Sequence, residues 1–121
     1  MPPIISASEP DYPPLAVVTA EGKADGFSVE LLRETLKAVD REVTFKVAPW
    51  PEIKKDLAEG HIQVLPLVGR TPERETVYDF TLAYLTLHGT VIRRKGDTRI
   101  NSVADLQDKA VIVMIMRMNT W

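Results

Sequence analysis

Arg70 and Arg74 are the residues of this sequence whose type and spacing best suit chemistry. They flank Thr71-Pro72, which is typical of a helix start because threonine caps a first turn and proline fits its first position. Gly69 lets the backbone turn out of the preceding strand and into this helix. The first turn of a helix disfavours cations and suits anions, and a guanidinium grips a carboxylate with two parallel hydrogen bonds. The segment therefore predicts a carboxylate or phosphate site.

A surface ion pair is the competing interpretation of Arg74. Acidic side chains stand close to it in the sequence, at Glu73, Glu75 and Asp79. Pairs of this kind are common on protein surfaces and contribute little to stability. The spacing alone gives the two interpretations about equal weight.

Three further residues are candidates for the same site. Glu9 and Tyr12 follow the first predicted strand, and Trp50 follows the second. Ligands of open α/β sheets bind beyond the carboxyl ends of the strands, so these side chains belong to one edge. There an acid suits a ligand ammonium, and an aromatic ring suits its apolar part. Composition alone favours the alternative, a solvated proline-rich loop with a rim or core tryptophan.

Several classes of chemistry lack their residues in this chain. It has no cysteine, no nucleophile-elbow sequence, no P-loop and no glycine-rich dinucleotide fingerprint. The two histidines, His61 and His88, have no partners at metal-ligand spacing. The net charge is −2, and Lys and Arg are spread along the chain. We therefore predict no metal, no cofactor and no nucleic-acid partner, and no apolar run approaches the roughly 20 residues that span a membrane.

The elements that position these residues alternate between strand and helix. Strands are predicted over 4–7, 15–19, 43–47, 62–68, 85–94 and 110–116, and helices after Ser28, Trp50, Thr71 and Ser102, the second with Pro51 in its first position. Residues 62–68 are almost wholly apolar, as in a strand buried on both faces, although Pro66 suits a strand end better. This order predicts an α/β fold with a largely parallel sheet flanked by helices. A break is expected near 88–91, which separates 1–89 from 90–121.

Six segments carry a resemblance to a known family. They are Glu9-Pro10-Asp11-Tyr12-Pro13-Pro14, Gly26-Phe27-Ser28-Val29-Glu30-Leu31, the stretch from Trp50 to Gly60, Gly69-Arg70-Thr71-Pro72-Glu73-Arg74, Tyr78-Asp79-Phe80-Thr81 with Tyr84, and Ser102-Val103-Ala104-Asp105-Leu106 with Lys109-Ala110-Val111. In this order they resemble family 3 of the bacterial extracellular solute-binding proteins, the amino-acid type with the type II periplasmic-binding-protein fold. The Thr-Pro-Glu-Arg and Asp-Phe-Thr elements are fairly specific at this separation.

The resemblance implies a periplasmic protein of two lobes that clamp a small ligand, with no catalysis. Residues 1–89 would be the first lobe, and 90–121 the hinge crossing and the start of the second. Arg74 resembles the arginine that holds the ligand's α-carboxylate, with Tyr12 and Trp50 as aromatic walls. Glu9 and the backbone around Gly69 and Thr71 resemble polar contacts.

Three departures from the family pattern are visible. Gln63 stands where the family usually has aspartate, which puts one structural contact in doubt. Ala83 replaces a frequent proline before Tyr84. Family members also continue beyond the position of Trp121, where this sequence stops. We expect the chain to represent the first half of such a protein.

The resemblance leaves more than one function open. Leu65-Pro66-Leu67-Val68-Gly69-Arg70 and Leu85-Thr86-Leu87-His88-Gly89 are most similar to sensor modules of membrane histidine kinases and diguanylate cyclases. The runner-up is the receptor of an amino-acid ABC importer, which also works beside a membrane protein. A dehydratase-like enzyme is a third reading, with Glu9 as the one local acid. Exposed lobe surface with unpaired strand edges also predicts a possible homodimer.

Overall fold

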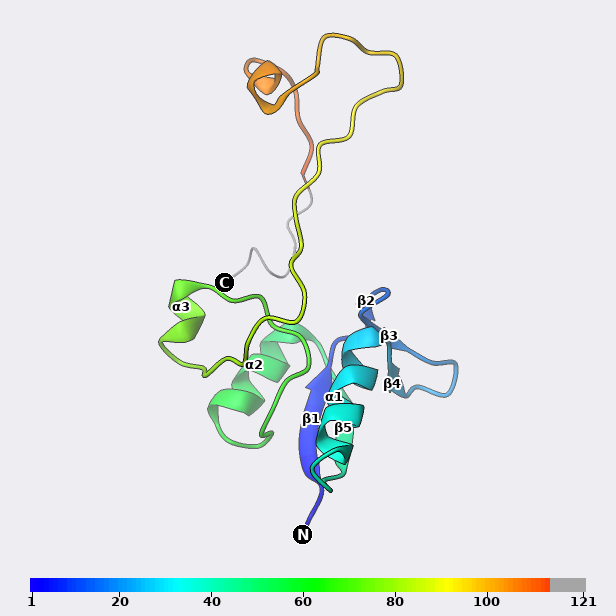
Figure 1. The fold of residues 1–121 in the computed structure, drawn as a ribbon, viewed down its shortest axis with the longest axis vertical. Coiled ribbons are helices and arrows are strands. Elements are labelled where there is room, and N and C mark those ends of the chain that lie inside the picture. The colour runs from blue at the N-terminus through cyan, green and yellow to red at the C-terminus, as the bar shows by residue number, and fades with distance from the viewer. Residues whose placement is uncertain (114–121) are drawn as a thin grey trace.

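The structure, a computed structural model, describes residues 1–113. Its elements are β1 (Ile4–Ser8), β2 (Asp11–Tyr12), β3 (Ala16–Val18), β4 (Ala24–Asp25), α1 (Phe27–Lys37), β5 (Val43–Val47), α2 (Trp50–Ala58), α3 (Pro72–Glu75) and the 3-10 helix η1 (Val103–Leu106). Figure 1 shows a body that holds every element except η1, which lies at the far end of a long excursion of the chain.

The centre of the body is a parallel pair of strands, β1 and β5. They run in register from Ile4 opposite Val43 to Ser8 opposite Val47, so their carboxyl ends meet at one edge. A third segment joins β1 through a single parallel bridge between Ser6 and Val64. A separate antiparallel sheet of order β2-β3-β4 lies beside α1. The α/β class with a parallel sheet is confirmed.

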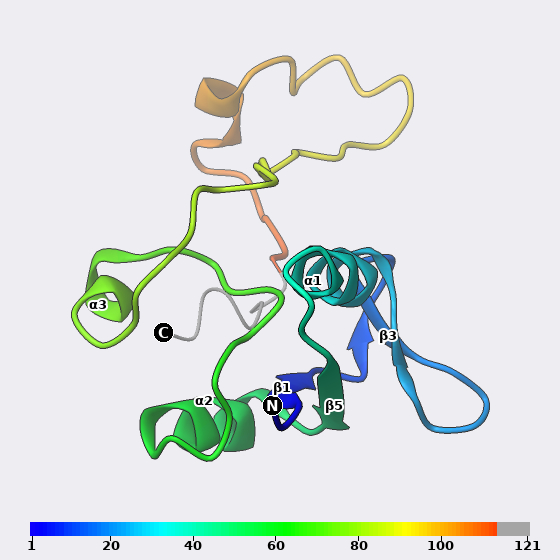
Figure 2. The same cartoon turned by 60° about the horizontal axis from the view of Figure 1, so that its bottom comes forward.

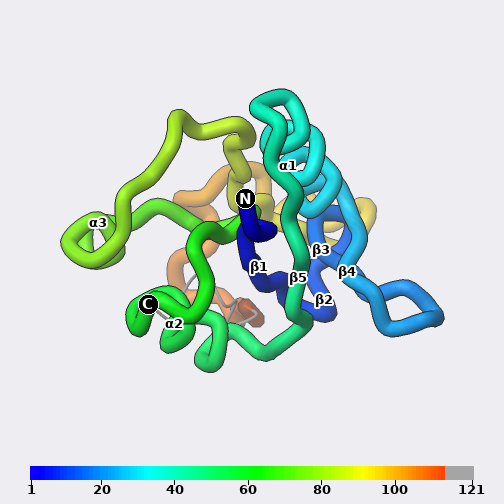
Figure 3. Tube along the Cα trace, turned by 90° about the horizontal axis from the view of Figure 1, so that it is seen from below, coloured from blue at the N-terminus to red at the C-terminus, as the bar shows by residue number. Residues whose placement is uncertain are grey.

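The two longer helices cover opposite faces of the parallel pair (Figures 2 and 3). On one face, Ile53 of α2 packs with Ala7 of β1, and both are 1% exposed. On the other face, Arg33 of α1 lies 5.3 Å from the ring centroid of Phe45 in β5. Alternate residues of a strand point to opposite faces, and Phe45 lies opposite Ser6, the neighbour of Ala7, so Ala7 and Phe45 contact different helices.

The start of α1 differs from its prediction. Gly26, not Ser28, is the N-cap residue, with φ 111° and ψ 170°. A Cβ at Gly26 would lie 2.5 Å from the carbonyl oxygen of Leu15, so only glycine fits this close approach. The Ser28 side chain is buried and hydrogen-bonds the hydroxyl of Tyr84 at 2.7 Å. The predicted cap is wrong because a tertiary contact takes that hydroxyl.

The predicted strand over 62–68 is also wrong, since Val64 alone bridges to β1. Beside this bridge, Gln63 takes the place of a strand partner for Ile5 in β1. The Gln63 Oε1 accepts the Ile5 N–H at 2.8 Å, and the Gln63 N–H donates to the Ile5 carbonyl at 2.9 Å. Pro66 has no N–H to continue the ladder. From Val64 to Val68 the side chains are half-buried rather than buried on both faces.

Residues 85–94 form no strand, contrary to the prediction. An extended segment needs a neighbouring strand for its N–H and C=O groups, and none of the described residues supplies one. The strand predicted over 110–116 is wrong for 110–113, and its remainder lies outside the described residues. A two-residue strand forms instead where the prolines predicted none, at β2, which pairs with β3.

Candidate functional site

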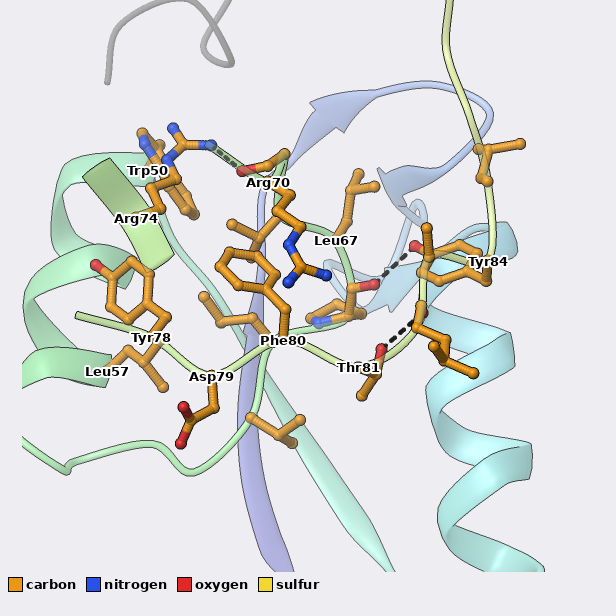
Figure 4. Close-up of a pocket in the computed structure, with 18 of the residues that line it drawn as sticks. Trp50, Leu57, Leu67, Arg70, Arg74, Tyr78, Asp79, Phe80, Thr81 and Tyr84 are labelled. Atoms are coloured by element: carbon orange, nitrogen blue, oxygen red, sulfur yellow. Dashed lines mark hydrogen bonds between the residues drawn. The ribbon is translucent and has the colours of Figure 1, made fainter. Parts of the chain in front are cut away.

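A cleft of about 680 Å³ opens where β1 and β5 end. Its wall includes Glu9 just after β1, Tyr12 on β2 and the first residue of α2, Trp50. The rest of the wall comes from Leu57 and Ala58 of α2 and from 63–70, 74 and 77–87, with Arg74 on α3 (Figure 4). Of the seven residues predicted for the site, six line this cleft: Glu9, Tyr12, Trp50, Gly69, Arg70 and Arg74. Thr71 does not.

Arg74 is the most buried charged residue of the described chain, with 5% of its surface exposed. Its Nη1 donates to the Gly69 carbonyl at 2.9 Å, and its guanidinium carbon lies 5.0 Å from the Trp50 ring centroid. Burial lowers the pKa of Arg74, while electrostatic interactions with Tyr78 and Glu9 act in the opposite direction. The group keeps its charge, because the ordinary pKa of arginine lies far above neutral. A buried guanidinium excludes the interpretation of Arg74 as a solvated surface charge.

The prediction that Thr71 caps α3 is confirmed, but this helix contributes less to the anion preference of the cleft than the sequence analysis assumed. Thr71 Oγ1 accepts the Arg74 N–H at 3.1 Å, and Pro72 opens the helix. The helix is only four residues long, so few aligned peptide dipoles add up along it. The anion preference of the cleft therefore rests on the guanidinium of Arg74, and Thr71 acts by fixing the backbone of that residue.

Arg70 makes the surface ion pair that was considered for Arg74. Its Nε donates to Glu75 Oε1 at 2.9 Å, and the two side chains are 56% and 46% exposed. Its guanidinium carbon lies 5.5 Å from the ring centroid of Phe80. Figure 4 shows this guanidinium beside the Phe80 ring, among the lining side chains. Arg70 is thus a second, more accessible cation in the same cleft as Arg74.

Trp50 is held on two sides. It begins α2 after the N-cap Pro49, and its ring packs against the buried core of Ala7, Ala48 and Ile53. Its other neighbour is the guanidinium of Arg74. The indole Nε1 is buried and has no hydrogen-bond partner among residues 1–113. The ring therefore serves as a rigid apolar platform for the arginine.

Sequence reasoning missed the aromatic residues that complete the cleft. Tyr78, Phe80 and Tyr84 all line it. The Tyr84 hydroxyl donates to the Pro66 carbonyl at 2.7 Å and also bonds Ser28 on α1. These residues stand in the Tyr-Asp-Phe-Thr segment and just after it, so the repeated aromatic residues were a usable signal.

Two kinds of feature are absent from residues 1–113. No group of three histidine or carboxylate side chains there is placed to hold a metal ion. Over the same range no helix is both long and apolar enough to cross a membrane. The chemistry of the cleft is that of charged and aromatic side chains.

The α/β body, with a cleft at the carboxyl ends of its parallel strands, matches part of solved structures that have the periplasmic-binding-protein fold. The chain belongs to the bacterial extracellular solute-binding proteins, family 3, whose profile matches residues 4–119. The resemblance drawn from the motifs is confirmed.

Curated relatives of the chain carry amino-acid-binding names. The chain is 30% identical over 95 residues to the probable amino-acid-binding protein YxeM of Bacillus subtilis. This alignment covers 78% of this chain and 36% of that protein. The chain is 27% identical over 107 residues to a probable amino-acid ABC transporter-binding protein of Haemophilus influenzae, covering 88% of this chain and 42% of that one. The chain therefore spans less than half the length of these two relatives.

Solved structures of three kinds share the fold. An ancestral arginine-binding protein bound to glutamine matches with a TM-score of 0.68 and 28% identity, over 85% of this chain and 46% of that one. A histidine kinase sensor domain matches with a TM-score of 0.58 and 28% identity, over 61% of this chain and 32% of that one. An ancestral cyclohexadienyl dehydratase matches with a TM-score of 0.60 and 25% identity, over 68% of this chain and 34% of that one.

Proposed function

We propose that the cleft binds a small, amino-acid-like solute and that Arg74 holds its α-carboxylate. The observation that carries this proposal is the guanidinium of Arg74, 5% exposed, in the wall of an open cleft and stacked on Trp50. Burying a charge is costly unless an opposite charge or hydrogen bonds compensate for it. A ligand carboxylate supplies both and is held in a geometry that the guanidinium fork matches.

The same geometry indicates roles for the other residues of the site. Trp50 and Tyr12 form the aromatic walls for the apolar part of the ligand. Glu9, whose charge already acts on Arg74, faces the ligand ammonium. The backbone at Gly69 supplies polar contacts, and Thr71 contributes by capping α3 rather than by lining the cleft.

Two lobes complete the proposed site. Residues 1–89 form the first lobe, and residues 90–121 form the crossing to a second lobe and its beginning. The long excursion of the chain after residue 88 supports this division (Figure 1). Closure of a second lobe over the cleft would remove the ligand from water and strengthen its contact with Arg74.

We place the protein outside the cytoplasm, as the sensor module of a membrane signalling protein of the histidine kinase type. The match to a histidine kinase sensor domain supports this reading. The alternative is the receptor of an amino-acid ABC importer, which the Haemophilus influenzae relative supports. A transmembrane helix and a kinase or cyclase domain in the same gene would decide for sensing.

We propose binding without turnover. The curated relatives described above are binding proteins, and the dehydratase is one solved structure that shares the fold. A dehydratase needs a general acid or base in the cleft, and Glu9 and Asp79 are the carboxylates in its wall. Conversion of a bound amino acid or cyclohexadienyl acid by the full-length protein would replace this proposal with an enzymatic one.

The test is calorimetric titration of the full-length protein with a panel of amino acids, before and after Arg74→Gln. We expect the affinity for carboxylate ligands to fall by about 2–5 kcal/mol, which is roughly 30-fold or more. Arg33→Gln is the matched control, because it removes the same charge from α1, where Arg33 pairs with Glu30 and lies outside the cleft wall. An Arg74→Gln protein that binds the same ligand with unchanged affinity would refute the assignment.

A further inference from the structure

Arg70 is held in place by two contacts from different parts of the wall. Glu75 at the end of α3 accepts a hydrogen bond from its Nε at 2.9 Å. Phe80, ten residues along the chain, supports the guanidinium with its ring at 5.5 Å. An arginine loses much side-chain entropy when it is ordered, and these two contacts order this one before any ligand arrives. The guanidinium is therefore pre-positioned in the cleft (Figure 4).

The terminal nitrogens of Arg70 remain available. Glu75 engages the Nε alone, and neither Nη1 nor Nη2 has an acceptor among residues 1–113. These two nitrogens carry four of the five N–H donors of the side chain. Together they form the end of the fork that receives a planar carboxylate in two parallel bonds. Glu75 thus orients the guanidinium without using the part that binds a bidentate partner.

The charges around the cleft distinguish the two arginines. Arg74 is buried against Trp50 and feels the charge of Glu9. Arg70 lies nearer to solvent and beside Phe80. A ligand that presents one carboxylate satisfies only the first of these cations. A ligand with a second negative group satisfies both, while a cationic side chain would face Arg70 unfavourably.

We infer that Arg70 recognises a second carboxylate, so that the solute of this cleft is a dicarboxylic amino acid. This inference rests on the proposed function, because it takes Arg74 as the site of the α-carboxylate. Arg70 is then the residue that sets specificity for the ligand side chain. A carboxylate is favoured over its amide, since an amide oxygen accepts hydrogen bonds without adding opposite charge.

The experiment compares matched ligand pairs on the full-length protein: glutamate with glutamine, and aspartate with asparagine. Calorimetric titration of the wild type is expected to show at least one acid binding about tenfold more tightly than its amide, the gain expected from one charge-assisted contact. Arg70→Gln is expected to weaken binding of the acid about tenfold and binding of the amide by less, so that the preference for the acid is lost. Glu75→Gln is the matched variant, because it removes the negative charge beside Arg70 and keeps both Arg70 and an acceptor for its Nε. We expect it to retain or increase the preference for the acid.

The outcomes separate this inference from the proposed function. If an amide binds as tightly as its acid in the wild type, or if Arg70→Gln keeps the preference, the inference is overturned while the amino-acid site stands. If no amino acid binds and Arg74→Gln changes nothing, the proposed function fails and the inference fails with it. Loss of the preference in Arg70→Gln, with both the acid and the amide still bound, supports both.

Discussion

Gly26→Ala tests the close approach that fixes the start of α1. The backbone of Gly26, at φ 111° and ψ 170°, lies in a region that is essentially restricted to glycine, and placing alanine there costs about 1–3 kcal/mol. The new Cβ would also lie 2.5 Å from the Leu15 oxygen and 2.8 Å from its carbon. That oxygen accepts the Ser28 N–H at 2.9 Å, so the chain must move and weaken a hydrogen bond worth about 0.5–1.5 kcal/mol.

We expect Gly26→Ala to lower the free energy of unfolding by about 1.5–4.5 kcal/mol, the sum of these costs. Urea unfolding followed by far-ultraviolet circular dichroism measures this change. Gly22→Ala is the control, because Gly22 also has a positive φ, 83°, but a Cβ there meets nothing within 4 Å. Its cost is the conformational strain alone, about 1–2 kcal/mol. Equal destabilisation by the two substitutions would refute the reasoning from the Leu15 contact.

Two further predictions concern hydrogen bonds of named side chains. Tyr84→Phe should destabilise the fold by about 1–3 kcal/mol, because it removes the partner of the buried Ser28 hydroxyl and the bond to the Pro66 carbonyl. In urea unfolding, the double variant with Ser28→Ala should lose less than the sum of the single variants; strict additivity would contradict the contact. The hydrogen bond from Lys46 at 2.9 Å lowers the pKa of Asp56, so this carboxylate stabilises the fold above the ordinary carboxyl pKa and ceases to do so as pH falls through the lowered value. Thermal unfolding from neutral to acid pH should therefore show Asp56→Asn less stable than the wild type near pH 7 and the difference vanishing in acid, and a difference that persists in acid would argue against the pair.

The sequence predicted those elements whose signals are local. The alternation of Val43, Phe45 and Val47 gave β5, and the Thr71-Pro72 pair gave the start of α3. These patterns depend on neighbours in the chain, so no tertiary information is needed to read them. Arg74 belongs to the same group, because its place beside a capped turn follows from four adjacent residues.

Elements that depend on distant partners were predicted poorly. The apolar run 62–68 and the segment 85–94 look like strands, yet a strand exists only where another chain segment pairs with it. Gly26 as a cap depends on the carbonyl of Leu15, eleven residues away. The stacking of Arg70 on Phe80 is equally non-local, and this is why the sequence placed both arginines together but could not assign them different surroundings.

Gln63 has a consequence for how the molecule avoids aggregation. Its side-chain oxygen and its backbone N–H together occupy the N–H and the C=O that Ile5 presents on the side of β1 away from β5. A strand of another molecule that approaches this edge of β1 finds no free donor or acceptor at Ile5. The edge therefore cannot template strand pairing between molecules at that position. The amide carries no titratable proton, and this protection therefore does not vary with pH.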